Sequence, residues 1–228
     1  FESLRRFTER CPDYLQLWPG HGAGSACGKA LGALPQTTLG YEKLTNWAFQ
    51  IDREERFVEA ILDGQPDPPT YFGAMKRINR DGPPLLGGRP APPLRAAPDL
   101  AAVLARGDLV IDLRRSDAFA GGHVPGTINI PLNRGFVGYA GWIVPYDRDL
   151  YLLSDSDADE PARQAAAELA TIGLDRVAGW FAADAPATWT LGGGTLATLG
   201  QVAVTDLPDR QAHGAAVVDV RSPAEWRE

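Results

Sequence analysis

The spacing of apolar and polar residues along the chain predicts a mixed α/β protein. Short apolar runs bounded by Gly, Pro or Asp are typical of buried strands, whereas apolar residues three and four positions apart predict amphipathic helices. Strands are expected at 14–18, 109–113, 127–131, 149–154 and 175–178. Helices are expected at 38–50, 53–62, 70–79, 98–106, 116–120 and 160–173, with Asp52 and Glu55 forming a capping pattern for the second of these. Because strands and helices alternate, the sheet should be parallel.

The domain organisation follows from two composition breaks and one repeat. Pro and Gly crowd residues 83–97, which predicts a linker, and 191–200 is a second, weaker break. Behind each break a similar stretch begins: "LVIDLRRSDAFAGGH" at 109–123 aligns with "AVVDVRSPAEWRE" at 216–228. Asp112 then aligns with Asp219, Arg114 with Arg221 and Phe119 with Trp226. The repeat is domain-sized, so we divide the chain into 1–82, a first repeated domain at 98–190, and the start of a second at 201–228.

Composition and charge exclude several classes of protein. Hydrophobic residues make up 44% and charged residues 22%, which is ordinary for a globular domain. The net charge of −7 argues against a nucleic-acid partner, because no basic face is available to replace phosphate counterions. No apolar run is long enough to span a membrane, and no export signal is visible. The two cysteines form no disulfide framework, so the expected location is cytoplasmic.

The first repeated unit resembles a rhodanese domain. The stretch "DLRRSDAFAGGHVPGTINIP" at 112–131 is similar to the family's entry motif, in which Asp-x-Arg is followed by an aromatic residue and then by Gly-His-x-x-Gly and Asn-Ile-Pro. The resemblance implies a five-stranded parallel sheet flanked by helices. It also implies that Asp112, Arg114 and His123, with Asp219 and Arg221 in the second unit, support the loops of this fold.

The loop that carries the persulfide-forming Cys in active rhodaneses has no Cys in this chain. Ser154, Asp155 and Ser156 occupy the region, and Asp157, Asp159 and Glu160 follow. Carboxylates would repel the anion that such a loop must hold, so the first unit is expected to be non-catalytic. A serine nucleophile would lack a base nearby in sequence. A calcium loop is also excluded, because its sixth position would be Glu160 and its twelfth Ala166.

The glycine-rich stretch near the start of the chain offers two chemistries. "AGSACGKA" at 23–30 approaches a phosphate-binding loop, but Ala23 replaces its first Gly and Ala30 its Ser or Thr. We therefore reject nucleotide binding. The alternative begins from "YLQLWPGHG" at 14–22, where an expected strand delivers His21 to its carboxyl end.

The whole opening region resembles the C-terminal segment of metallo-β-lactamase-fold persulfide dioxygenases, which are relatives of glyoxalase II. The similarity covers "PGHGAGSACGKALGALPQTTLGYEKLTNWAF" at 19–49 and "PPTYFGAMKRINRDGP" at 68–83. It implies an αββα domain, of which 1–82 would be the C-terminal part. Some members of this family are fused to two rhodanese units, the first of which lacks its Cys, so this chain resembles an internal fragment of such a fusion.

The resemblance also implies a chemistry and a set of site residues. Family members use one Fe(II), held by two His and one Asp, to oxidise a thiol persulfide to sulfite. His21 would correspond to the His that binds the second metal ion in binuclear relatives. Alternatively, it would contact the iron ligands without binding the iron itself. Cys27 is either a small buried residue or, with Lys29, a substrate-side group. The remaining metal ligands are absent from this sequence, so the chain alone is expected to be metal-free and inactive.

Three functions remain open at this point. The first is iron-dependent oxidation of a low-molecular-weight thiol persulfide, coupled to rhodanese sulfur transfer. The second is a glyoxalase II-like thioester hydrolase with two zinc ions and appended rhodanese units. The third is a non-catalytic docking scaffold, and homo-oligomer formation is left open for all of them.

Overall fold

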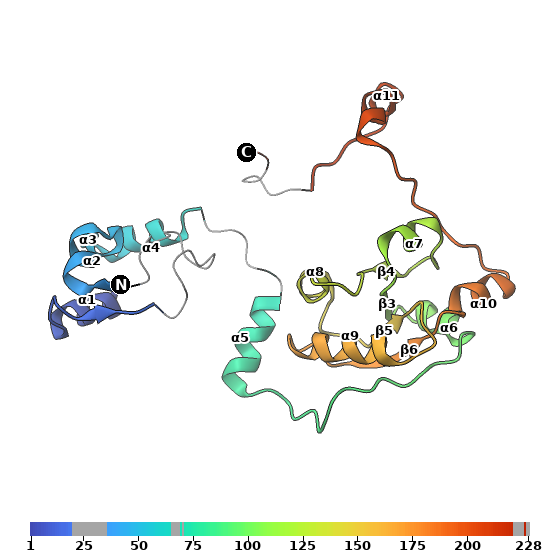
Figure 1. Cartoon of the computed structure of the whole chain (residues 1–228), viewed down its shortest axis with the longest axis horizontal. Helices are drawn as coiled ribbons and strands as arrows, with labels where there is room; N and C mark the ends of the chain where they lie inside the picture. The colour runs from blue at the N-terminus through green and yellow to red at the C-terminus, as the bar shows by residue number, and fades with distance from the viewer. Residues whose placement is uncertain (20–35, 65–68, 70, 221–225, 227–228) are drawn as a thin grey trace. The chain divides into compact units, whose positions relative to one another are not determined.

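The computed structural model confirms a mixed α/β fold with a parallel sheet. It describes residues 1–19, 36–64, 69, 71–220 and 226, and the chain divides into two compact units (Figure 1). Unit 1 is Phe1–Asp67 and unit 2 is Pro68–Glu228. Among the described residues, no helix is long and apolar enough to cross a membrane.

Unit 1 consists of short helices and one antiparallel strand pair. Its elements are α1 (Glu2–Arg10), β1 (Gln16–Leu17), β2 (Thr37–Thr38), α2 (Leu39–Thr45), α3 (Trp47–Gln50) and α4 (Glu54–Leu62). The predicted helix at 38–50 is therefore two helices. Asn46 has extended backbone angles, ends α2 and accepts a hydrogen bond from the Ala48 amide at the start of α3. An Asn at this position is well suited to cap a new helix.

The expected capping pattern before α4 is wrong. The residue that precedes the helix is Arg53, which is extended and makes no side-chain capping bond. Asp52 therefore lies one residue too early to reach the first free amides. Glu54 and Glu55 occupy the first turn instead, where negative charge interacts favourably with the helix dipole.

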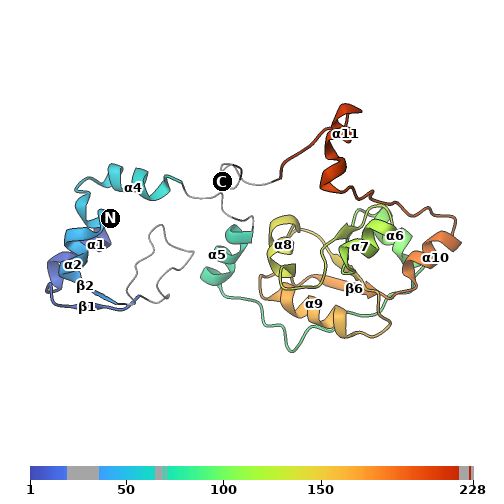
Figure 2. The same ribbon diagram turned by 45° about the horizontal axis from the view of Figure 1, so that its top comes forward.

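Unit 2 contains the predicted parallel sheet with helices on both faces (Figure 2). Its elements are α5 (Tyr71–Asp81), α6 (Asp99–Ala105), β3 (Leu109–Asp112), α7 (Ser116–Gly121), β4 (Ile128–Asn129), α8 (Phe136–Ile143), β5 (Leu150–Leu153), α9 (Glu160–Ala170), β6 (Val177–Phe181), α10 (Ala185–Leu191), η1 (Val204–Asp206) and α11 (Leu207–Ala212). The strand order is β4-β3-β5-β6, with every neighbouring pair parallel. A single parallel bridge from Leu94 to Trp180 lies beside β6, in the place of the expected fifth strand.

The alternation of side chains along the strands divides the core of unit 2 into two layers. Ile111 and Leu152 point toward a cluster that includes residues of α8 and α9, whereas Val110 and Leu153 point toward one that includes residues of α6 and α10. All four strand side chains are fully buried. Both faces of the sheet are thus covered, which explains why β3 and β5 read as continuous apolar runs in the sequence.

Helix α5 is grouped with unit 2, although the sequence division placed residues 1–82 together. Tyr71 and Met75 pack against the cluster beneath α8 and α9. The side chain of Ile78 occupies the space where Gly173, just after α9, would carry a Cβ. The packing of three residues one turn apart makes α5 an integral helix of the parallel-sheet unit.

Parts of both predicted linkers are docked on unit 2. In 83–97, the amide of Arg95 donates to Trp180 O at 2.8 Å, and the amide of Trp180 donates to Pro93 O at 3.0 Å. In 191–200, Ala197 and His123 exchange two backbone hydrogen bonds of 2.9 Å. Through these hydrogen bonds, parts of both Pro- and Gly-rich segments pack against unit 2 and belong to its fold.

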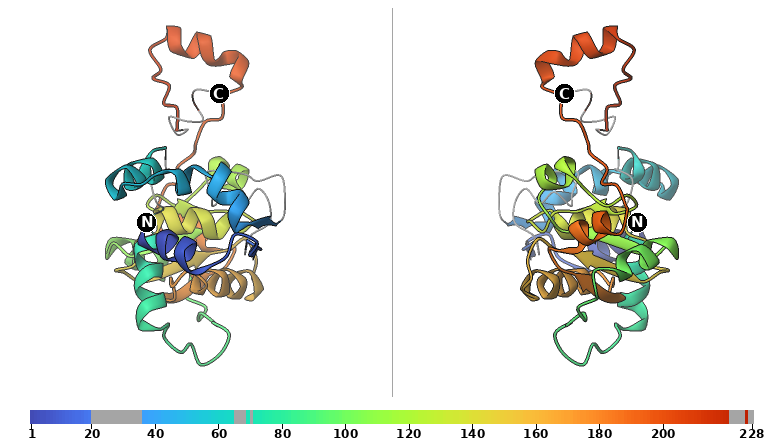
Figure 3. Two further views of the ribbon diagram at one scale, coloured as in Figure 1. Left: turned by 90° about the vertical axis from the view of Figure 1, so that its left-hand side faces the viewer. Right: turned by 90° about the vertical axis from the view of Figure 1, so that its right-hand side faces the viewer.

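Residues 216–220, which align with the β3 region in the repeat, do not form a strand. The structure gives 215–220 no regular secondary structure and leaves these residues exposed, after the short helices η1 and α11 (Figure 3). A strand is stable only when its backbone groups pair with a neighbour, and no described strand pairs with this segment. The apolar pattern alone therefore did not produce a strand here. Helices α8 and α10 were not predicted, and β6 begins and ends later than expected.

Candidate functional site

The Asp-x-Arg motif forms a buried ion pair at the carboxyl end of β3. Asp112 is fully buried and Arg114 is 13% exposed, with 2.7 Å between Nη2 of the arginine and Oδ2 of the aspartate. The guanidinium Nε donates to both carboxylate oxygens at 3.0 and 3.1 Å, and the Arg114 amide adds a bond of 3.0 Å to Oδ1. The Asp112 carboxylate is thus satisfied by its own loop.

The same ion pair holds the neighbouring loops in place. Arg114 Nη2 also donates to Gly122 O at 3.0 Å, which ties the end of α7 to the strand. From β4, the side-chain amide of Asn129 donates to Asp112 O at 3.0 Å and to Arg114 O at 2.8 Å. These bonds all lead to groups of the protein itself, so the motif braces the loops around the end of β3.

Arg115, which follows the motif, differs from Arg114 in its surroundings. Its side chain is exposed and forms an ion pair of 3.1 Å with exposed Asp117. The hydrogen bond from Arg115 lowers the pKa of the Asp117 carboxyl below its ordinary value. Because water surrounds both groups, this pair should contribute little to stability, and it serves as a natural comparison for the buried pair.

His123 is a packed structural residue. Its ring stacks on Phe119 with 3.8 Å between ring centroids, and Nδ1 lies 3.0 Å from Phe119 O. Its backbone pairs with Ala197. Both the stacking partner of the ring and the partner of Nδ1 therefore belong to Phe119, one helical turn earlier.

The loop after β5 contains the serines that replace the expected Cys. Ser154 is 1% exposed, and its Oγ accepts a hydrogen bond of 3.1 Å from the Ser156 amide. The Ser156 Oγ in turn accepts one of 3.0 Å from the Ala158 amide. Two backbone N–H groups of the loop are therefore bonded to its own hydroxyls, whereas a persulfide loop would direct such groups at the bound anion.

The electrostatics of this loop also oppose anion binding. Asp155, Asp157 and Asp159 are exposed, and the nearby Arg163 and Arg89 are paired with Asp159 and Glu160. A thiolate or persulfide is stabilised by positive potential, and this loop supplies negative charge instead. The geometry is that of a closed, acidic surface turn.

Several candidate residues from the sequence cannot be placed. His21, Cys27, Lys29 and Arg221 lie outside the described residues. Asp219 is exposed in a segment without regular structure. Within the described part of the chain, no group of three or more His, Cys, Asp and Glu side chains could hold a metal ion. The side chains of the described residues therefore do not fit a metal centre.

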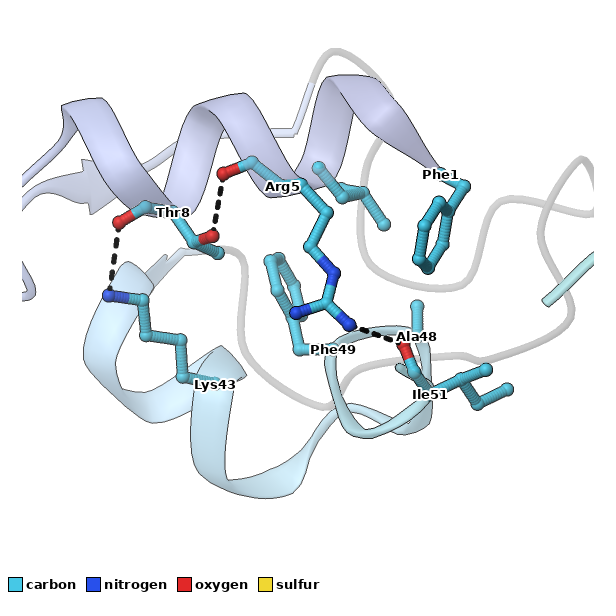
Figure 4. A pocket seen from close by; sticks show the side chains of 8 residues that line it. Phe1, Arg5, Thr8, Lys43, Ala48, Phe49 and Ile51 are labelled. Atoms are coloured by element: carbon cyan, nitrogen blue, oxygen red, sulfur yellow. Dashed lines mark hydrogen bonds between the residues drawn. The ribbon is translucent and has the colours of Figure 1, made fainter. Parts of the chain in front are cut away.

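Unit 1 has a pocket of about 270 Å³ between α1 and the α2–α3 segment (Figure 4). Its walls include Leu4, Phe49 and Ile51, and its polar groups are already engaged. Arg5 donates to Ile51 O at 3.3 Å, and the Lys43 ammonium bonds to Thr8 O at 3.4 Å. Lys43 also pairs with Asp13. The pocket brings together none of the site residues predicted from the sequence.

The sequence analysis placed residues 195–199 in a linker and did not predict that they pack against unit 2. Trp189 Nε1 donates to Thr195 O at 3.2 Å, and the Leu199 amide donates to Ala120 O at 2.9 Å. Leu196 packs against the core cluster beneath α6 and α10. The apolar residues Leu196 and Leu199, spaced within a Gly-rich stretch, were the available signal that this segment is docked.

Comparison with known proteins gives a mixed result. No protein-family model matches the chain. No curated protein matches it either. Among solved structures, a metallo-β-lactamase from Staphylococcus aureus is 40% identical, with a TM-score of 0.55 over 79% of this chain and 48% of that one. The chain thus spans about half the length of that protein.

Rhodanese-like proteins are also among the structural neighbours. The rhodanese-like domain of an Anabaena protein is 24% identical, with a TM-score of 0.38 over 57% of this chain and 92% of that one. A thiosulfate sulfurtransferase from Pseudomonas aeruginosa is 18% identical, with a TM-score of 0.36 over 63% of this chain and 26% of that one.

Proposed function

We propose that this chain is part of a sulfur-metabolising fusion enzyme in which a metallo-β-lactamase-fold domain oxidises a low-molecular-weight thiol persulfide to sulfite. In this proposal the rhodanese-like unit described above is non-catalytic, and a second such unit transfers sulfane sulfur. The whole enzyme would use one Fe(II), for which the described residues of this chain supply no set of three ligands.

One observation carries the proposal most strongly: the match to the S. aureus metallo-β-lactamase extends across both units. Unit 2 accounts for about 71% of the residues, because it runs from Pro68 to Glu228 of a 228-residue chain. A match over 79% of the chain must therefore reach into both units. A match that reaches into both units is more specific than a match confined to one of them.

The chemistry of the β5–α9 loop supports the assignment of a supporting role to this unit. Ser154 stands where the persulfide-forming Cys is expected, and its hydroxyl closes the loop through the Ser156 amide. The buried Asp112–Arg114 pair is nevertheless intact. A unit that keeps its bracing interactions without its nucleophile is best explained as a spacer or docking module between catalytic parts.

The proposal is tested on the whole protein purified without oxygen, with metal content and two reactions measured in parallel. We expect about one iron per chain, O₂ uptake with glutathione persulfide as the probe, and sulfite as product. The thioester S-lactoylglutathione should be hydrolysed slowly or not at all. Ser154→Ala should leave both O₂ uptake and sulfur transfer unchanged, since that hydroxyl only closes its own loop.

The opposite pattern would favour the rival function. Two zinc ions, rapid thioester hydrolysis and no O₂ uptake would indicate a glyoxalase II-like hydrolase with appended rhodanese-like units. A third result would favour the docking scaffold: in Arg114→Met, turnover is unchanged and limited proteolysis separates the domains while circular dichroism shows that unit 2 is still folded.

A further inference from the structure

The pocket of unit 1 combines apolar walls with two basic side chains. It has a volume of about 270 Å³ and is lined by α1, α2, α3 and the residues that flank α1 and α3 (Figure 4). Its apolar side chains are Phe1, Leu4, Ala48, Phe49 and Ile51. None of the described residues that line it is an Asp or a Glu, although acidic residues outnumber basic ones by 29 to 22 in the whole chain. This composition suits an anion that has an apolar body.

The two basic side chains differ in how far their charge is already neutralised. The Lys43 ammonium forms an ion pair of 2.5 Å with the Asp13 carboxylate, and the Lys43 side chain is 31% exposed. Arg5 has no carboxylate partner in the described part of the chain. Its guanidinium lies 5.1 Å from the centroid of the Phe1 ring, which carries no net charge. The pocket therefore has one uncompensated positive charge, that of Arg5.

Most hydrogen-bond donors of the Arg5 guanidinium are still available. An Arg side chain has five N–H groups arranged in a planar fork. Among the described residues, only Ile51 accepts a hydrogen bond from this fork, through its backbone oxygen at 3.3 Å from Nη2. Figure 4 shows the Arg5 side chain reaching from α1 across the pocket to Ile51. A carboxylate could accept two parallel hydrogen bonds from the remaining donors.

We propose that this pocket binds a small monocarboxylate with an apolar body, such as an aryl or alkyl acid. Arg recognises a carboxylate well because its planar fork matches the two oxygens. A dianion would bring a second charge out of water without a partner, which is costly. The volume lies just below the roughly 300–1,000 Å³ of sites for drug-sized molecules, so a ligand of about ten non-hydrogen atoms is the right size. This binding is independent of the persulfide chemistry proposed above, because it uses none of the residues assigned to that chemistry.

An amide NMR titration of the full chain with phenylacetate tests the proposal, with phenylacetamide as an uncharged probe of nearly the same shape. We expect saturable shifts that centre on Arg5, Ala48 and Phe49. Phenylacetamide should bind at least about tenfold more weakly, because it lacks the charge that strengthens the bonds to the guanidinium. Equal binding of the two probes would overturn the proposal. So would the absence of saturable shifts up to about 10 mM, since even weak specific complexes have millimolar dissociation constants.

Substitutions in and beside the pocket locate the site. Arg5→Met keeps an apolar stem but removes the charge, and it should raise the dissociation constant for phenylacetate at least about tenfold. Arg6→Met is the matched control, since Arg6 is the next residue of α1, is exposed and does not line the pocket. It should change the dissociation constant less than about twofold, because an exposed charge interacts weakly through water. Equal losses in the two variants would indicate a general effect of surface charge and overturn the proposal.

A second variant covers the case in which Arg5→Met does not fold, which circular dichroism would show. Ala48→Leu keeps the Arg5 charge but fills the pocket, so it should also weaken phenylacetate binding at least about tenfold. Unchanged binding in a folded Ala48→Leu variant would place the ligand elsewhere and overturn the proposal.

The carboxyl terminus of a peptide has similar chemistry but a larger body. The peptide acetyl-Ala-Ala-Phe is too large for a pocket of about 270 Å³, so it should bind more weakly than phenylacetate. Tighter binding of the peptide would overturn the assignment to a small molecule and indicate a protein partner.

Discussion

Breaking the buried Asp112–Arg114 pair should be one of the most destabilising single changes in unit 2. In Arg114→Met, the carboxylate of Asp112 stays fully buried. It loses the guanidinium bonds of 2.7, 3.0 and 3.1 Å and keeps only the bond from the backbone amide of residue 114. Removing one partner of a buried pair leaves an uncompensated charge, which costs about 3–5 kcal/mol. That is a large part of the roughly 5–15 kcal/mol that stabilises a typical domain.

The double variant Asp112→Asn with Arg114→Met makes this reasoning falsifiable. With the buried charge gone, the double variant should be less destabilised than the sum of the single variants, by about 1–3 kcal/mol. Native-state amide exchange of the β5 strand measures the opening free energy of unit 2 without interference from unit 1. Arg115→Met is the control and should change nothing measurable, because its pair with Asp117 is exposed. Strict additivity of the two single changes, or an Arg114→Met cost below about 1 kcal/mol, would refute the argument.

Three further changes probe the loop, a buried phenol and a glycine. Ser154→Cys should create no thiosulfate sulfurtransferase activity, because exposed carboxylates such as Asp155 oppose a persulfide; cyanide-dependent turnover above background would contradict this. Burial raises the pKa of Tyr146, whose hydroxyl donates to a backbone carbonyl at 2.7 Å. The protonated phenol therefore stabilises unit 2 fully below pH about 10, and this contribution is lost as pH rises through the folded-state pKa. Urea midpoints of wild type and Tyr146→Phe should accordingly converge above pH about 10, and a constant gap would contradict the assignment. Gly173→Ala should destabilise unit 2 by about 1 kcal/mol or more, because Gly173 has a positive φ of 77° and faces the Ile78 side chain. Gly138→Ala, in open space on α8, should instead stabilise by about 0.5–1 kcal/mol, and equal effects of the two would show that backbone conformation is not the cause.

The sequence predicted the parallel sheet well because its strands are buried on both faces. β3 and β5 are continuous apolar runs that pair with each other. Each also has a second neighbouring strand, so both are central strands of the sheet. The helices at α6 and α9 were found for a similar reason, since each has one apolar stripe. In contrast, α8 is apolar on nearly all sides, with buried Phe136 and exposed Trp142 on the same helix. A helical period is hard to detect when the outer face is also apolar.

The sequence predicted which residues form the motif but not which groups they would bond to. The resemblance to the rhodanese entry motif implied that Asp112 and Arg114 support the loops of the fold. That Gly122 O and the Asn129 side chain complete this network depends on tertiary contacts between segments up to 17 residues apart. The backbone pairing of Ala197 with His123 was not predicted for another reason. The Gly-rich composition around Ala197 is typical of a linker, and the pairing is seen only in the structure.

The Asp112–Arg114 network and the Ser154 loop differ in what they indicate about activity. In unit 2, Asp112 is satisfied by Arg114 and Asn129 without any contribution from the Ser154 loop. The motif therefore braces the loops whether or not a nucleophile is present. Selection for stability would preserve it in a unit that has no catalytic Cys, so the motif alone is no argument for activity. The residues of the loop after β5 are the ones that decide the chemistry, and in this unit they form an acidic turn whose hydroxyls close on its own amides.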